Sequence, residues 1–252
     1  MTATATRWPL VDGLHRSPVL TSLGLVAGFT TRAEGSLAGS VFPQDEQDRA
    51  RERLAHRLRF REIVRVRQVH GNTVVRAPHG ASPWPEGDAI WTGERGVLLG
   101  VAAADCVPVF IADPEGPIGI AHAGWEGTTK RVAETLVREL VAAGADVGSL
   151  VAAIGPSIGP CCYAIDDARA ALIRERLGPA AGVAIHSATD RITFDLWGAN
   201  ATQLADAGVR AVEIAELCTR CGGLDLWSYR SRGERGPQGT GLAVLGRPRE
   251  QA

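Results

Sequence analysis

The feature that most constrains the fold is a series of closely spaced, short apolar segments in the middle of the chain. Residues 97–104 and 107–112 are almost continuously apolar, and 117–122 follow after a short polar turn. Continuous apolar runs of this length are typical of strands that are buried on both faces. Helices do not alternate with these strands, which argues against a doubly wound parallel sheet and predicts an α+β fold with a mixed sheet.

The rest of the pattern extends this prediction over the chain. Strand-like runs lie at about 24–29, 63–69, 73–76, 97–104, 107–112, 117–122, 150–154, 162–165, 191–194, 210–214 and 241–245. Helical patterns lie near 45–59, 128–143, 166–177 and 197–207. With 252 residues and 45% hydrophobic composition, the chain can bury a full core, and we expect a single domain spanning residues 1–252.

Charge and hydropathy exclude several classes of partner. The net charge of −1 gives no electrostatic basis for binding nucleic acid or an anionic membrane. No apolar run approaches membrane-spanning length, and residues 1–16 lack the apolar core of a signal peptide. We therefore expect a soluble cytoplasmic protein, whose oligomeric state the sequence does not indicate.

Three potential metal ligands each stand at the end of an apolar run. His70 ends 63–69, whose alternation directs it to the core side of a strand, Cys106 follows 97–104, and His122 closes 117–122. Two imidazoles and a thiolate suit zinc, and three protein ligands leave a fourth position open, as in catalytic sites. The simpler alternative is a pair of core histidines and a buried, inert cysteine.

The segment after His122 favours an anion. A helical pattern starts at about Thr128, and Gly124 and Gly127 allow the backbone to approach a ligand closely. Free amides at a helix start would favour an anion such as phosphate, which a phosphorolysis reaction requires. An ordinary capped turn between strand and helix explains the same pattern.

Carboxylates near these ligands are candidates for proton transfer. Zinc deaminases need such a group, and the candidates are Asp88, Asp105 and Glu126. Asp105 also suits the role of an anchor that holds a ligand or a turn. Glu126 would repel phosphate unless an arginine compensates, and the arginines considered for this are Arg32, Arg67 and Arg131.

The cysteines are expected to be reduced thiols, because five is an odd number and the chain has no export signal. Cys218 and Cys221 form a CxxC pair, but a zinc ribbon would need a second pair, and the adjacent Cys161 and Cys162 lack normal spacing. We therefore predict no second metal site. Cys161 or Cys162 is instead expected to line the active-site cleft.

Five ordered motifs resemble the YfiH-type laccase-domain family, whose members are called polyphenol oxidases, purine nucleoside phosphorylases or peptidoglycan editing factors. The matching segments are Arg67–Gly71, Gly87–Ala89, Ala104–Pro108, His122–Trp125 and Ile154–Tyr163, within a resemblance that runs from Gly28 to Arg230. The resemblance implies layered mixed sheets flanked by helices. It also implies that His70, Cys106 and His122 bind zinc.

The resemblance implies an activity as well: phosphorolysis of adenosine, inosine, guanosine and methylthioadenosine to base and ribose 1-phosphate, with deamination of adenosine. Nucleoside and phosphate are then the small-molecule partners. Asp105 and Glu126 are the predicted catalytic residues, and the predicted substrate contacts are Arg32, Arg67, Gln68, Gly124 and Cys162.

The chain departs from the family pattern near the expected substrate site. Glu126 stands where the family usually has arginine in His-Ala-Gly-Trp-Arg-Gly. Residues 35–42 replace the usual Ser-Leu-Asn-Leu stretch, and a Gly-Arg pair is missing around 239–241. These changes affect substrate and phosphate contacts and leave the predicted metal ligands intact.

Other functions fit part of the pattern. Cys106 with His70 or His122 could serve a cysteine hydrolase, and a peptidoglycan-precursor editing enzyme is a further alternative. A non-catalytic interaction module explains the converging polar residues least well. Copper is less favoured than zinc, because a blue-copper centre typically has an axial methionine and Met1 is the sole methionine.

Overall fold

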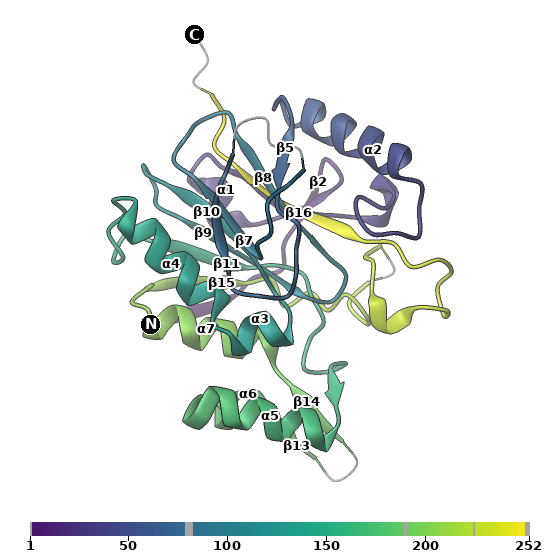
Figure 1. Cartoon of the computed structure of the whole chain (residues 1–252), viewed down its shortest axis with the longest axis vertical. Coiled ribbons are helices and arrows are strands. Elements are labelled where there is room, and N and C mark those ends of the chain that lie inside the picture. The colour runs from purple at the N-terminus through teal and green to yellow at the C-terminus, as the bar shows by residue number, and fades with distance from the viewer. Residues whose placement is uncertain (1, 79–82, 189–190, 224, 250–252) are drawn as a thin grey trace.

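Two large mixed β-sheets form the centre of the molecule (Figure 1). The computed structural model describes residues 2–78, 83–188, 191–223 and 225–249. The seven-stranded sheet has the order β1 (Thr2–Ala5), β15 (Ala211–Ile214), β11 (Val151–Ile154), β9 (Val107–Ala112), β10 (Ile118–Ala123), β7 (Ala89–Thr92) and β6 (Val74–Arg76). The six-stranded sheet has the order β2 (Leu10–Val11), β3 (Leu14–Arg16), β4 (Val26–Thr30), β16 (Gly241–Gly246), β8 (Leu98–Ala103) and β5 (Ile63–Arg65).

The remaining elements surround these sheets. A small third sheet has the order β12 (Ala164–Ile165), β14 (Ile192–Phe194) and β13 (Ile185–Ser187). The α-helices are α1 (Pro18–Ser22), α2 (Gln44–Arg57), α3 (Trp125–Thr129), α4 (Val132–Ala142), α5 (Asp167–Leu177), α6 (Ala181–Ala184) and α7 (Leu196–Asp206). Short 3₁₀ turns are η1 (Arg32–Glu34), η2 (Gly178–Ala180) and η3 (Tyr229–Ser231).

The elements form four layers. Leu99 of β8 and Phe110 of β9 share one buried cluster, so the two large sheets pack face to face. Leu54 of α2 packs on the outer face of the six-stranded sheet, and Leu136 of α4 packs with α7 on the outer face of the seven-stranded sheet. The order is therefore helix, sheet, sheet, helix, and it confirms the predicted α+β class.

The predicted strands and helices are present, with two informative differences. The expected strand 63–69 ends at Arg65, after which the side chain of Gln68, rather than the backbone, bonds Ala102 of β8. The expected helix 128–143 is two helices, because Arg131 adopts a left-handed conformation (φ 60°) between α3 and α4. Both differences change the chain direction close to the predicted metal ligands.

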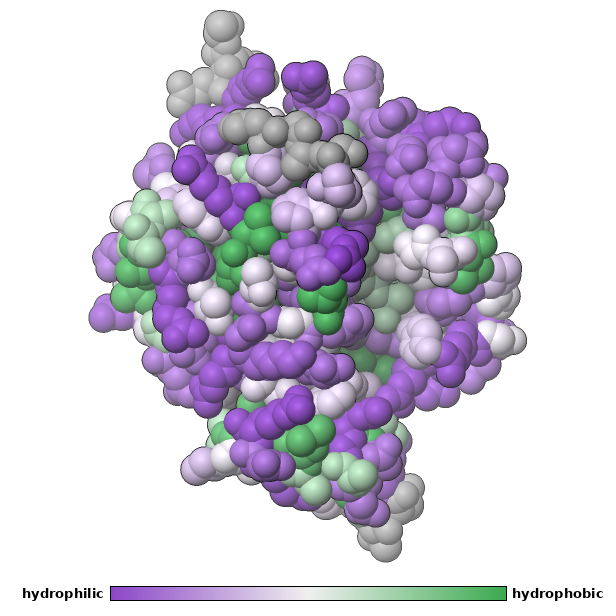
Figure 2. Space-filling model, in the orientation of Figure 1, coloured by the Kyte–Doolittle hydropathy of each residue, from purple (hydrophilic) through white to green (hydrophobic). Residues whose placement is uncertain are grey.

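The core strands have the burial that their apolar runs predict. Every residue of β8, β9 and β10 is buried. None of the helices among the described residues is long and apolar enough to cross a membrane. The face shown in Figure 2 is mainly hydrophilic, with apolar side chains in separate small patches.

Candidate metal centre and active-site cavity

The predicted metal ligands meet where the chain passes between the two large sheets. Cys106 lies in the turn from β8 of one sheet to β9 of the other, and His70 lies in the connection from β5 to β6. His122 is near the end of β10, which runs antiparallel to β9, with Ala123 opposite Val107. The start of one strand and the end of its neighbour therefore bring Cys106 and His122 together.

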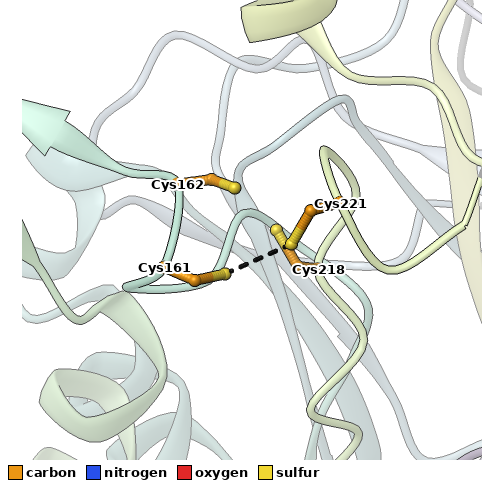
Figure 3. Close-up of side chains that lie close together, drawn as sticks. All are labelled: Cys161, Cys162, Cys218 and Cys221. Carbon is orange, nitrogen blue, oxygen red and sulfur yellow. Dashed lines mark hydrogen bonds between the residues drawn. The ribbon is translucent and has the colours of Figure 1, made fainter.

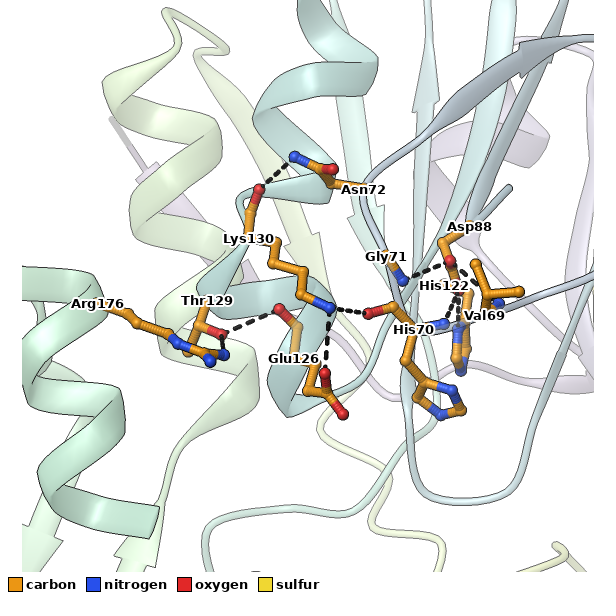
Figure 4. A network of polar contacts seen from close by, with 10 residues as sticks. All are labelled: Val69, His70, Gly71, Asn72, Asp88, His122, Glu126, Thr129, Lys130 and Arg176. Atoms are coloured by element: carbon orange, nitrogen blue, oxygen red, sulfur yellow. Dashed lines mark hydrogen bonds and ion pairs between the residues drawn. The ribbon is translucent and has the colours of Figure 1, made fainter. Parts of the chain in front are cut away.

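Asp88 fixes two of the ligands. It precedes β7, which pairs with β10, and its carboxylate accepts a hydrogen bond from His122 Nδ1 at 3.0 Å. The same carboxylate accepts the backbone N–H groups of Val69, His70 and Gly71 at 2.6–3.2 Å (Figure 4). These bonds hold His70 in a left-handed conformation (φ 58°), which is uncommon for a residue other than glycine.

Cys106 and His122 stabilise each other's charged forms. Burial by itself would raise the pKa of Cys106, but His122 and His70 lower it to about 6. Burial would lower the pKa of His122, but Cys106 and Asp88 raise it to about 9. A thiolate is therefore favoured at neutral pH, and the thiolate is the form that binds metal.

The geometry fits one metal ion. The ligand atoms of His70, Cys106 and His122 all lie within 4.8 Å of one another, and tetrahedral zinc would require separations of roughly 3.5 Å. The His70 and His122 rings are 4.9 Å apart at 77°, so both rings approach the same point from different directions. A histidine that binds a metal usually donates its other ring N–H to a carboxylate. Asp88 is placed to accept such a bond from His122.

This centre opens into a cavity of about 790 Å³. His70, Cys106 and His122 form part of its wall, with residues from α2, the 65–70 segment and the 229–240 segment. Aromatic side chains and arginines also line it: Trp84, Trp125, Tyr163, Tyr229, Arg51, Arg65, Arg67, Arg169 and Arg230. The volume is in the range of small-molecule sites.

Asp105 lines the cavity, but its bonds favour the anchor role over the base role. Thr219 Oγ1 donates to one carboxylate oxygen at 2.5 Å, and the backbone N–H of Arg230 donates to the other at 2.7 Å. Asp105 itself has φ 91°. Both oxygens therefore hold the tight turn that presents Cys106, which leaves the side chain poorly placed to accept a proton from substrate.

Glu126 lines the cavity with a more available carboxylate. Lys130 Nζ donates to Glu126 Oε2 at 3.1 Å and to the carbonyl oxygen of His70 at 2.8 Å (Figure 4). The Glu126 side chain is 37% exposed. The lysine partly neutralises this carboxylate and links it to the loop that carries His70.

The predicted substrate contacts divide into two groups. Arg67 and Gln68 line the cavity. The Gln68 amide is already occupied, because it donates to the carbonyl of Ala102 and accepts from its N–H. Gly124 is a spacer: a Cβ there would lie 2.8 Å from Cys106 Sγ and 3.4 Å from His70 Cδ2.

Arg32 and Cys162 lie outside this cavity. Arg32 stacks on Trp227, 4.4 Å from the ring centroid, and lines a separate small pocket. Cys162 is absent from the cavity wall, as is Cys161, and both sulfurs lie near those of Cys218 and Cys221. The expectation that Cys161 or Cys162 lines the cleft is therefore wrong, because the turn at 159–163 directs the sulfurs to the 218–221 loop.

The cationic wall of the cavity has no counterpart among the residues predicted from the sequence. Arg51 and Arg65 are both nearly buried, and both donate to the carbonyl of Leu37, at 2.5 and 3.3 Å. Arg65 also stacks on Trp84. Arg51 lies in an amphipathic helical pattern and Arg65 in a strand pattern, and neither residue has a local signal that predicts a shared site.

Comparison with known proteins gives the same family that the fold and centre suggest. The family model described as multi-copper polyphenol oxidoreductase laccase matches residues 27–246. The chain is 38% identical over 252 residues to a purine nucleoside phosphorylase of Deinococcus radiodurans, with 94% of each chain covered. It is 35% identical over 150 residues to adenosine deaminase RL5 of an unknown prokaryotic organism, covering 58% of this chain and 57% of that protein.

A solved structure supports the fold directly. The crystal structure of YlmD from Geobacillus stearothermophilus matches with a TM-score of 0.80 and 32% identity, over 95% of this chain and 97% of that one. Two facing mixed sheets with a His–Cys–His cluster at their junction define a laccase-like domain with a candidate metal centre. The chain belongs to the multi-copper polyphenol oxidoreductase laccase family, which confirms the resemblance to YfiH-type proteins.

Proposed function

We propose that this chain is a zinc-dependent purine nucleoside phosphorylase, which converts adenosine, inosine, guanosine and methylthioadenosine to base and ribose 1-phosphate. The observation that carries the proposal is one cavity whose wall combines His70, Cys106 and His122 with buried arginines. Relatives of similar length that are named purine nucleoside phosphorylases support it. Nucleoside and phosphate would be the small-molecule partners.

Aromatic residues give the cavity a surface for a purine. Trp125 and Tyr163 line it, and arginines lie over their rings: Arg169 at 5.2 Å from Trp125 and Arg230 at 4.8 Å from Tyr163. Aromatic faces bind bases by stacking, largely without regard to the base. This arrangement suits a site that accepts several purines.

Arg51 and Arg65 are the residues we assign to phosphate. The Nε of Arg65 is buried and has no hydrogen-bond partner among the described residues. Burial and the neighbouring Arg51 lower the pKa of Arg65 to about 9, so it remains cationic at pH 7. Asp48 pairs with Arg51, so two guanidinium groups share one carboxylate, and an anion would offset the excess charge.

His70, Cys106 and His122 would hold the zinc ion. A zinc ion held by these side chains would supply a Lewis acid at the cavity wall. The contact of His122 Nδ1 with Asp88 leaves Nε2 as the atom that would bind the ion. Gly124 leaves the space that the Cys106 sulfur needs, and Asp105 holds the turn before it.

Adenosine deamination is the second candidate activity. It is supported by the relative named adenosine deaminase and by Glu126, whose carboxylate lines the same cavity. Deamination needs a group that transfers protons, and Glu126 is more available than Asp105 for that role. The Lys130 contact would orient the Glu126 carboxylate.

The decisive experiment compares substrates with and without phosphate. Protein purified without contact with nickel is analysed for zinc and copper and is then incubated with each of the four nucleosides. Release of base and ribose 1-phosphate only with phosphate supports the phosphorylase, and inosine formed from adenosine without phosphate supports the deaminase. Absence of turnover by zinc-loaded protein overturns both activities.

The same preparations distinguish the alternative enzymes. Hydrolysis that survives zinc chelation but not Cys106→Ser supports the cysteine hydrolase. Turnover of peptidoglycan precursors alone supports the editing enzyme.

Arg65 provides the test of the phosphate assignment. Arg65→Gln removes a charge-assisted hydrogen bond, so we expect the phosphate KM to rise roughly 10- to 100-fold. Arg65→Lys keeps the charge and should recover part of the loss, with unchanged zinc content. Arg67→Gln is the comparison, because Arg67 is 63% exposed and paired with Glu86, and it should change the phosphate KM less. Equal effects of Arg65→Gln and Arg67→Gln would contradict the assignment.

A further inference from the structure

The remaining four cysteines come together at the end of the seven-stranded sheet that also carries Cys106. The sulfurs of Cys161, Cys162, Cys218 and Cys221 all lie within 4.8 Å of one another, and their side chains converge from two loops (Figure 3). These loops follow β11 and β15, which are parallel neighbours with Ile154 opposite Ile214. Parallel strands in register release their following loops at the same sheet edge, which the sequence spacing does not reveal.

The loop of Cys218 and Cys221 has the shape of a metal-binding turn. The backbone N–H of Gly159 donates to Cys218 Sγ at 3.3 Å, and the amides of Arg220 and Cys221 also face this sulfur. The chain folds back with Gly222 N–H donating to the carbonyl of Cys218 at 2.7 Å. N–H groups directed at a sulfur stabilise the thiolate, the form that binds a metal.

Glycine is required where this turn closes. A Cβ at Gly222 would lie 2.7 Å from the Cys218 carbonyl oxygen and 2.9 Å from its nitrogen, both of them backbone atoms that cannot move aside. On the facing loop, a Cβ at Gly159 would lie 2.6 Å from the Trp197 ring and 3.2 Å from Cys161 Sγ. Both loops are thus built to bring sulfurs close together.

The distances between the cysteine sulfurs favour a bound metal ion over a disulfide. Zinc bound by four thiolates at about 2.3 Å places the sulfurs roughly 3.8 Å apart. Cys161 Sγ and Cys221 Sγ are 3.4 Å apart, whereas a disulfide needs about 2.05 Å and an oxidant. One disulfide would also leave two adjacent thiols unused, while a tetrahedral ion engages all four.

The cysteine cluster is coupled to the first metal centre through Thr219. Thr219 lies between Cys218 and Cys221, and its hydroxyl donates to Asp105, the residue before Cys106. Its backbone N–H donates to the carbonyl of Ser157 at 3.0 Å. An ion that fixes the 218–221 turn therefore also fixes the turn that presents Cys106.

We propose that Cys161, Cys162, Cys218 and Cys221 form a tetrathiolate site for a structural zinc ion, which braces the wall of the active-site cavity. Each thiol gives its proton to solvent when the ion binds, and nothing is oxidised or reduced. Tetrahedral sulfur coordination is typical of structural zinc. The sequence prediction of no second metal site is thereby revised, because it considered only spacing along the chain.

Metal counting tests the proposal independently of activity. We expect two zinc ions per chain in wild-type protein purified under reducing conditions without nickel. The double variant Cys161→Ser with Cys221→Ser should retain one, and Cys106→Ser should lose only the other. With Co²⁺ in place of zinc, the sulfur-to-cobalt charge-transfer band should fall mainly in the double variant, because its site has four sulfurs and the first centre has one. Unchanged zinc content in the double variant overturns the proposal.

A second measurement needs no variant and so does not depend on the folding of a mutant. Cys161 and Cys221 are exposed, so iodoacetamide should reach and alkylate both of them in chelator-treated, reduced protein. Added zinc should protect both residues, as measured by peptide mass spectrometry. Equal alkylation of the two residues with and without zinc overturns the proposal. Both measurements remain decisive if the proposed nucleoside activity is absent.

Discussion

Carboxylates around the first candidate metal centre differ in how many hydrogen bonds their oxygens accept. Asp88 and Asp105 are both buried carboxylates whose oxygens accept hydrogen bonds from several donors. Glu126 is partly exposed and bonded mainly to Lys130. The oxygens of Asp88 and Asp105 are occupied by these donors, whereas the Glu126 carboxylate lines the cavity, so Glu126 is the better candidate for proton transfer.

Glu126→Gln tests this assignment. The amide keeps the size of the side chain and can still accept from Lys130, but it cannot carry a proton between substrate and solvent. We expect deamination to fall about 10²-fold or more, the phosphate KM to fall rather than rise because one negative charge leaves the cavity wall, and zinc content to stay unchanged.

A matched variant controls for loss of a surface carboxylate. Glu134 lies on α4, pairs with Arg131 and Arg138, and is absent from the cavity wall. Glu134→Gln should leave both activities near wild type. If Glu126→Gln lowers phosphorolysis and deamination equally, Glu126 acts through Lys130 and the His70 loop and transfers no proton.

At the scale of elements, short connections between strands place the candidate metal ligands. The turn from β8 to β9, the end of β10 and the start of α3 meet at one point, and Gly124 is the N-cap of α3. Its backbone is extended (φ −69°, ψ −177°), which any residue can adopt. The requirement for glycine here is therefore one of space beside Cys106.

Gly124→Ala tests this requirement. The added Cβ would lie 2.8 Å from Cys106 Sγ, so the sulfur or the helix start must shift. We expect zinc affinity at the first centre to fall on the order of 10- to 100-fold, the range found when ligand orientation is disturbed, as measured by competition with a chelator.

Gly182→Ala is the matched control, because a Cβ there has no atom within 4 Å and Gly182 lies in α6. Zinc affinity should be unchanged and stability equal or slightly higher, since alanine favours a helix over glycine. Wild-type zinc affinity in Gly124→Ala would show that the helix start accommodates the methyl group without moving the ligand.

At the scale of the whole molecule, two facing sheets form the support on which the centre is built. Phe110 of β9 is fully buried between them and meets the Trp8 ring edge-on at 5.6 Å. β9 also runs from the turn of Cys106 and pairs with β10 and β11. Packing between the sheets therefore fixes the turn of Cys106 and, through β10, the position of His122.

Phe110→Ala should lower the free energy of unfolding by about 3–5 kcal/mol, because it leaves a cavity between the sheets. Tryptophan fluorescence during urea unfolding measures the change. Val141→Ala is the control, since Val141 is 41% exposed and should change stability by about 0.5 kcal/mol or less. A loss below about 1 kcal/mol in Phe110→Ala would mean that the two sheets close over the missing ring.

The sequence by itself determined the strands of the core and the α+β class, and it predicted the three candidate ligands of the first centre. Apolar runs such as 97–104 and 107–112 are long enough to predict buried strands, and local hydrophobicity is sufficient for that inference. His70, Cys106 and His122 stand where such runs end, which is a local signal too. The family motifs carried the remaining evidence for these residues.

The tertiary structure alone decided which distant residues share a site. Arg51 joins Arg65 because α2 packs beside β5, and Cys161 joins Cys221 because β11 and β15 are parallel neighbours. It also decided that Asp105 is an anchor, through bonds to Thr219 and Arg230. Hydrophobicity along the chain fixes which face is buried, but strand order and loop direction fix which polar atoms meet, and those depend on contacts far apart in sequence.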